Sequence, residues 1–108
     1  MGFGYIPDCG AICGLIECAI GRQPVYLGKP NRIMVDMAIE KTGFTPEETM
    51  VIGDRLYTDI ACGIQGEVDT LLVFTGEAKP EDLPETEFPP TYYCDSILDL
   101  YRCMVEME

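Results

Sequence analysis

The chain has 108 residues, enough for one small domain, and 47% of them are hydrophobic, so a buried core is expected. Its formal net charge of -12 argues against nucleic acid and anionic membrane surfaces as partners, because both bind clustered lysine and arginine. The absence of histidine from the sequence excludes histidine-containing metal sites and serine–histidine–aspartate triads.

Six cysteines are spread along the chain: Cys9, Cys13, Cys18, Cys62, Cys94 and Cys103. Their spacing lacks the paired C-x-x-C ligands of a zinc site, and the N-terminus lacks the basic and apolar segments of a signal peptide. We therefore expect reduced cysteines in the core of a cytoplasmic protein. The longest apolar stretch, Ala11 to Ile20, is interrupted by Glu17 and is far shorter than the about 20 residues that span a bilayer.

The first part of the chain predicts a helix and a short extended run. After the turn-rich residues 1–8, apolar residues with helical spacing predict a helix over 9–20 that ends at Gly21. Residues 25–27 resemble a short strand. The face of the helix expected to be buried consists of Ile12, Leu15, Ile16 and Ala19.

A second helix is predicted to begin at Pro30, which suits a first helical turn, and to end at Gly43. The string Thr45-Pro46-Glu47-Glu48 is a capping box for a single further turn. The apolar stripe expected for the second helix consists of Ile33, Met34, Met37 and Ala38.

The rest of the chain alternates predicted strands and helices. Strands are expected at residues 49–52, 70–74 and 91–94, with helices over 58–65 and after Asp95 as the capping residue, and with a proline-rich surface loop at 75–90. This alternation predicts an α/β fold with parallel strands joined by right-handed crossovers. Ligands bind such sheets at the carboxyl ends of the strands, which directs attention to the loop that begins at Gly53.

Two aspartates flank the turn that follows the strand at 49–52. Asp54 comes directly after Gly53, whose freedom allows a tight turn, and Asp59 falls in the first turn of the next helix. Both carboxylates can therefore point to one place above the sheet, where a hard cation such as Mg²⁺ would find oxygen ligands. The alternative is that Thr58 caps the helix and Asp59 only complements its dipole.

A lysine precedes the second helix in the string Gly28-Lys29-Pro30-Asn31. Held between a glycine and a helix-initiating proline, Lys29 can offer a positive charge to a phosphoryl group or an anionic intermediate. The alternative is a solvated surface lysine. The order of Lys29, a helix, a strand and then Asp54 favours the functional interpretation.

These strings resemble motifs III and IV of the haloacid dehalogenase (HAD) superfamily, most closely subclass IIA, the NagD-like and para-nitrophenyl phosphatase branch. The resemblance rests on Gly28-Lys29-Pro30 and on the string from Gly53 to Ile60, and continues through Val68-Asp69-Thr70 to Thr75-Gly76. It implies that residues 1–108 form a single partial domain, the C-terminal half of a Rossmann-like three-layer core with a small parallel sheet, flanking helices and no cap.

The resemblance also implies roles for individual residues. Asp54 would bind Mg²⁺ and Asp59 would support the metal, so both are expected metal-site and catalytic residues. Lys29 would neutralise the phosphorylated intermediate, and Lys29 with Asn31 would contact the phosphate of a phosphorylated small molecule. Such a chain would belong to a magnesium-dependent phosphatase that acts on phosphate monoesters.

The sequence departs from the family pattern in three places. It has no Asp-x-Asp-Gly string, which carries the family's nucleophile, and no upstream Ser or Thr of the second motif. Gln65-Gly66-Glu67 stands where the family tends toward Asn-Ala-Gly, so Gly66 could end the helix. We therefore expect a truncated core that holds Mg²⁺ weakly and is inactive or poorly active alone.

The resemblance also implies that the strand ending at Asp54 lies beside the strand that bears the family's nucleophile. Without that neighbour, the strand from Thr49 to Ile52 would become an apolar sheet edge. Bare edges recruit other strands, so we expect a homodimer or higher oligomer, unless residues 1–27 fold back over the gap. A non-catalytic oligomeric or metal-binding remnant is the alternative function. A phosphate-receiving regulator domain is rejected, because its acids precede its lysine, whereas here Lys29 comes first.

Overall fold

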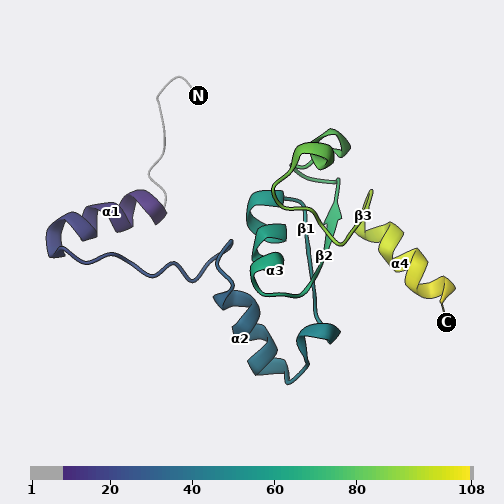
Figure 1. Cartoon of the computed structure of the whole chain (residues 1–108), viewed down its shortest axis with the longest axis horizontal. Coiled ribbons are helices and arrows are strands. Elements are labelled where there is room, and N and C mark those ends of the chain that lie inside the picture. The colour runs from purple at the N-terminus through teal and green to yellow at the C-terminus, as the bar shows by residue number, and fades with distance from the viewer. Residues whose placement is uncertain (1–8, 108) are drawn as a thin grey trace.

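The computed structural model describes residues 9–107, which form three parallel β-strands and the helices around them (Figure 1). The helices are α1 (Cys9–Ile20), α2 (Ile33–Thr42), α3 (Ala61–Gln65) and α4 (Ile97–Glu106), and the strands are β1 (Met50–Gly53), β2 (Asp69–Val73) and β3 (Tyr92–Cys94). Short helical turns of the 3₁₀ or π type occupy Pro46–Glu48, Leu56–Ile60 and Pro80–Glu85. The α/β class and the partial core are confirmed.

The sheet has the order β1-β2-β3, and both pairs are parallel. In the register, Gly53 at the end of β1 pairs with Leu72 of β2, and Val73 pairs with Cys94 of β3. The loops that follow β1 and β2 therefore leave the sheet at the same end. Strand β1 is an edge of the sheet, as the sequence predicted.

The core lies on both sides of β2, whose residues after Asp69 are all buried. One apolar cluster joins Val35 of α2 to Cys62 and Val68, with Ile39 and Val51 packed against them. The other consists of Ile60, Leu72 and Ala78, together with Leu56, Phe74, Leu83 and Phe88. Helices α2 and α3 thus pack against the sheet through the first cluster, while the loop after β2 contributes Ala78, Leu83 and Phe88 to the second.

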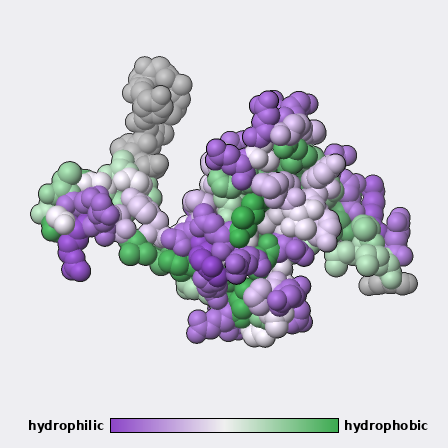
Figure 2. Space-filling view, viewed as in Figure 1, coloured by the Kyte–Doolittle hydropathy of each residue, from purple (hydrophilic) through white to green (hydrophobic). Residues whose placement is uncertain are grey.

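Helix α1 spans the predicted residues and ends at Gly21, which has a positive φ of 70°. The expectation that this helix buries an apolar face is wrong, because α1 has no buried residue and Leu15 is 72% exposed. Residues 25–27 are extended but pair with no strand of the described sheet, and Figure 1 shows α1 set apart from the sheet. Figure 2 shows apolar surface over this part of the chain.

Helix α2 begins at Ile33, three residues later than predicted, and ends as expected before Gly43, whose φ is 77°. The stripe predicted to be buried is wrong, since Met34 and Met37 are exposed. Val35 and Ile39 face the core instead. The periodicity marked the helix correctly but assigned the wrong face to the interior.

The predicted helix over 58–65 is two elements, because the N–H of Ile60 donates to the carbonyl of Arg55, five residues earlier, at 3.1 Å. This π-type turn precedes α3. The helix end did not shift to a left-handed Gly66, whose φ is -79°. Glu67 takes the left-handed conformation itself, with a φ of 58°.

Two further expectations are corrected. The cap of α4 is Ser96, whose side chain accepts from the N–H of Asp99, and not Asp95. The cysteines are all free, but Cys9, Cys18 and Cys103 are exposed and only Cys62 is fully buried, so most are not core residues. Within residues 9–107, no helix has the length and apolar character needed to cross a membrane.

Candidate functional site

The side chains of Lys29 and Asp59 form an ion pair at the carboxyl end of β1. Lys29 lies in the turn before α2, and Asp59 lies in the π-type turn after β1. Asp59 is buried, whereas the lysine side chain is half exposed. The second carboxylate oxygen of Asp59 accepts from the N–H of Arg55 at 3.3 Å. Both oxygens of this buried acid therefore have a donor from the protein.

Gly53 allows the close approach of Asp59 to the end of the strand. A Cβ added at Gly53 would clash with the Cβ and carboxylate of Asp59. The sequence predicted a tight turn at this glycine, and the structure gives the reason: the acid packs directly over the glycine backbone.

Asp54 follows β1 and is held by the loop after β2. Its Oδ2 accepts from the N–H of Glu77 at 3.0 Å, and its carbonyl oxygen accepts from the N–H of Ala78 at 2.9 Å. Gly76 leaves room for this contact, since a Cβ there would clash with the Asp54 carboxylate. The loops after two neighbouring parallel strands thus meet through Asp54.

The pKa of Asp54 lies below the ordinary value for aspartate, chiefly because of the hydrogen bond from the Glu77 N–H, with smaller contributions from the charges of Arg55 and Lys29. The carboxylate is therefore ionised near neutral pH. The contribution of Lys29 indicates that its charge acts on Asp54 as well as on Asp59. Lys29, Asp54 and Asp59, predicted from separate strings, come together at one end of the sheet.

A second group of polar side chains, which sequence reasoning did not identify, lies beside Asp54. The Nε of Arg55 lies 2.9 Å from an Oε of Glu77, and the Tyr57 hydroxyl donates to the same carboxylate at 2.8 Å. This hydrogen bond raises the pKa of Tyr57. Glu77 lies four residues after the end of β2, whereas Asp54 directly follows β1, so its place in the loop after a buried strand was only a weak signal in the sequence.

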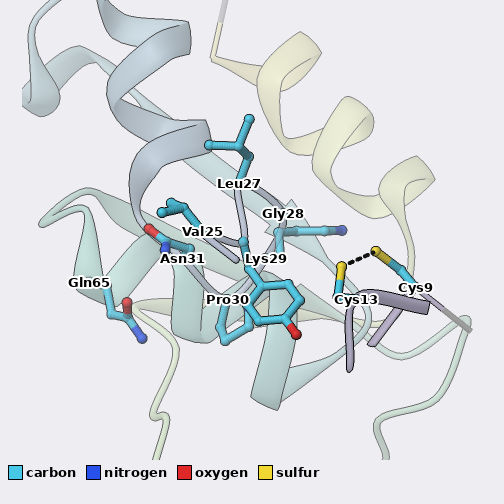
Figure 3. A pocket seen from close by; sticks show the side chains of 10 residues that line it. Cys9, Cys13, Val25, Leu27, Gly28, Lys29, Pro30, Asn31 and Gln65 are labelled. Atoms are coloured by element: carbon cyan, nitrogen blue, oxygen red, sulfur yellow. Dashed lines mark hydrogen bonds between the residues drawn. The ribbon is translucent and has the colours of Figure 1, made fainter. Parts of the chain in front are cut away.

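Asn31 has a structural role in addition to the predicted contact with phosphate. Its Oδ1 accepts from the N–H of Ile33 at the start of α2 at 3.1 Å, and its carbonyl oxygen accepts from the Cys62 thiol at 3.3 Å. Asn31 also lines, with Lys29, a cavity of about 680 Å³ (Figure 3). Phosphate binding by Asn31 stays a prediction.

The chemistry of the acids suits a hard cation but supplies only part of a ligand set. Among residues 9–107, no three cysteine or acidic side chains are grouped so as to hold a metal ion. Mg²⁺ commonly binds through one or two carboxylates and completes its shell with water and phosphate oxygens. The carboxylates of Asp54 and Asp59, both in the segment after β1, are of the kind that this mode of binding uses.

Comparisons with known proteins agree with this geometry. The HAD-hydrolase-like family model matches residues 26–100. Ribonucleotide monophosphatase NagD of Escherichia coli K12 is 37% identical over 99 residues, covering 92% of this chain and 40% of its own length. Dihydroxyacetone phosphatase of Corynebacterium glutamicum is 37% identical over 100 residues, covering 93% of this chain and 36% of its own length.

Solved structures give the same result. The 4-nitrophenylphosphatase of Thermotoga maritima superimposes with a TM-score of 0.78 at 40% identity, covering 92% of this chain and 38% of the other. NagD from E. coli K-12 superimposes with a TM-score of 0.75 at 39% identity, covering 87% of this chain and 38% of the other.

The chain thus spans about 40% of the length of the curated relatives it matches, and it corresponds to their C-terminal portion. The family match includes both the lysine turn and the aspartate loop. The chain belongs to the HAD-like hydrolases, in the subclass IIA group of NagD-like phosphatases.

Proposed function

We propose that this chain supplies the lysine and the acidic half of a magnesium-dependent site that hydrolyses phosphate monoesters. The observation that carries the proposal is the Lys29–Asp59 ion pair next to the ionised carboxylate of Asp54. Asp54 would hold Mg²⁺, with Asp59 in support. When bound, the ion would offset negative charge on the phosphoryl oxygens.

Each residue of the chain has a distinct task in this proposal. Asp59, buried and held by the Arg55 N–H, orients the ammonium group of Lys29. Lys29 in turn stabilises negative charge that develops on a phosphoryl group. Asn31, on the wall of the same cavity as Lys29, offers its amide to a phosphate oxygen.

The substrate class is a phosphorylated small molecule. The relatives are named ribonucleotide monophosphatase, dihydroxyacetone phosphatase, acid sugar phosphatase and 5'-nucleotidase. Their shared chemistry is a phosphate monoester, while the attached groups differ. The acidic chain and its composition suit a protein of the cytoplasm with no nucleic acid or membrane partner.

The isolated 108-residue chain is expected to be a poor phosphatase or none. No Asp-x-Asp-Gly string is present in it to supply a carboxylate nucleophile, and the covalent step of the family requires one. A phosphate-release assay with Mg²⁺ and an aryl phosphate tests this expectation. Turnover by the isolated chain that disappears in Asp54→Asn would contradict it.

A graft tests the assigned roles directly. The matching region of E. coli NagD is replaced by this chain, and hydrolysis of p-nitrophenyl phosphate is measured with Mg²⁺. Lys29→Ala and Asp54→Asn should each lower kcat by about a hundredfold or more. Lys41→Ala, which changes a lysine in the last turn of α2, is the matched control and should leave the rate unchanged. Equal rates in all folded grafts would overturn the proposal.

The second candidate function is a non-catalytic module that associates with its own copies through β1. The edge position of β1 and the exposure of Met50 and Ile52, at 39% and 43%, favour it. Light scattering at micromolar protein should give a dimer or larger species, and Ile52→Lys should shift it toward monomer. Met37→Lys, on the exposed side of α2, is the control. A wild-type monomer would contradict this function.

A further inference from the structure

Two cysteine thiols lie side by side on α1, on the wall of the cavity that Lys29 and Asn31 also line. Cys9 and Cys13 are four residues apart, so they occupy the same face of the helix on successive turns. Their sulfur atoms are 3.9 Å apart, and Figure 3 shows both side chains directed toward each other. Both are free thiols.

Both cysteines of the pair line the wall of a cavity. The cavity of about 680 Å³ is lined by α1, by the extended segment after it and by the turn that carries Lys29. Cys13 is half-buried and Cys9 is exposed. A ligand can therefore reach the sulfurs from the cavity.

The distance between the sulfurs matches that of two thiolates on one tetrahedral metal ion. Zinc–sulfur bonds are about 2.3 Å long, and a tetrahedral angle then separates the two sulfurs by about 3.8 Å. The thiols need little movement to bind an ion between them. Thiolates are soft ligands that select soft or borderline cations over Mg²⁺ or Ca²⁺.

We propose that Cys9 and Cys13 form a two-thiolate site for a soft divalent cation of the Zn²⁺ and Cd²⁺ class. No third cysteine or acidic residue of the described chain joins them in a metal-binding group, so two positions of the ion stay open to water or a small ligand. A structural zinc site has four protein ligands, and this one has two. The ion therefore binds exchangeably.

Binding requires the loss of thiol protons. Desolvation, and then the hydrogen bond with Cys9, raise the pKa of Cys13. A cation that binds the pair must displace these protons, as metals do at other cysteine sites. The thiols suit a soft ion, whereas the carboxylates of Asp54 and Asp59 suit a hard ion.

Cadmium titration of the whole chain tests the site, with the ultraviolet sulfur-to-cadmium charge-transfer band as the readout. One ion per chain should bind to the wild type. Cys9→Ser and Cys13→Ser should each weaken binding by roughly a hundredfold, because one thiolate loses the effective concentration supplied by the other. Cys18→Ser, which removes an exposed thiol of the same helix, should bind like the wild type.

Alkylation followed by peptide mapping gives a second, site-specific measurement. Cadmium should protect Cys9 and Cys13 together, while Cys18 and Cys103 continue to react. Circular dichroism of each variant checks that the helices are retained. Unchanged cadmium affinity in both pair variants, or protection of all exposed cysteines alike, would overturn the proposal.

Discussion

The ion pair between Lys29 and Asp59 joins two parts of the chain that are 30 positions apart. Lys29 lies in the turn between the extended segment that follows α1 and the start of α2, and Asp59 belongs to the turn after β1. A hydrogen bond from the Cys62 thiol to the carbonyl oxygen of Asn31 reinforces the same connection at 3.3 Å. The contacts that position the candidate catalytic lysine therefore also fix the start of α2 against the sheet.

Replacement of Asp59 by asparagine should lower the free energy of unfolding by about 1–3 kcal/mol, because a buried acceptor with two partners is altered. Urea denaturation measures the change. In a double-mutant cycle with Lys29→Met, the coupling should be only about 0.5–1 kcal/mol, since the half-exposed lysine is screened by water. A coupling near zero would show that the pair contributes nothing in solution.

Gly76→Ala should disturb the loop that holds Asp54. The added methyl group clashes with the Asp54 carboxylate, so we expect a loss of about 1–3 kcal/mol and faster hydrogen exchange at the Glu77 amide. Gly28→Ala is the matched control, because nothing lies within 4 Å of its added Cβ and its effect should stay within about 0.5 kcal/mol. Equal effects of both variants would contradict this packing.

The sequence predicted the elements around the site well, because local signals there agree with the tertiary structure. Gly43 has the left-handed conformation that its place after a helix requires, and Thr45 forms the expected capping box with Glu48. The apolar strands pair in parallel. Lys29, Asp54 and Asp59 lie in turns and loops at the carboxyl ends of these strands. Each of these features depends on a few neighbouring residues or on strand polarity.

Burial on the helices was harder to predict, because a periodic stripe does not say which neighbour covers it. Leu15 and Ile16 follow the helical period of a core face, yet nothing within the described chain buries them. Val35 is the residue of α2 that is buried in the core, and its methyl groups lie against the backbone of Gly66. Glu77 was missed for a similar reason: its role depends on β1 and β2 being neighbours.

Val35→Ala should identify α2 as the helix anchored in the core. Val35 is 5% exposed and packs against Cys62 and Val68, so its truncation should cost about 2 kcal/mol of unfolding free energy. Met37→Ala removes a larger side chain, but that side chain is 53% exposed, so the change should stay within about 0.5 kcal/mol. Thermal or urea denaturation compares the two. A larger effect at Met37 would reverse the assigned face.

The cap of α4 can be tested by comparing two adjacent residues. Ser96 accepts from the N–H of Asp99, and the Asp99 carboxylate accepts from the N–H of Ser96. Ser96→Ala should therefore lower the free energy of unfolding, or of local opening of α4, by about 1 kcal/mol. Asp95→Ala should have a smaller effect, because Asp95 lies outside the capping box. Amide exchange in the first turn of α4 distinguishes the two, and a larger effect at Asp95 would restore it as the cap.

Because of the buried thiol of Cys62, the free energy of unfolding should fall as the pH rises into the alkaline range. Desolvation raises the pKa of this thiol in the folded chain, so its neutral form is favoured there relative to the unfolded chain. The stabilisation is complete below the unfolded value of about 8.5 and is lost as the pH rises from there through the folded value. The hydroxyl of Cys62→Ser still donates to the Asn31 carbonyl oxygen but does not titrate. The unfolding free energy of this variant should therefore fall less steeply above about pH 8.5.

Urea denaturation at several pH values measures the slope of the unfolding free energy against pH. Cys103→Ser, at an exposed position, is the control and should keep the wild-type slope. If the slope of Cys62→Ser matched that of the wild type, the alkaline loss would have to come from other groups.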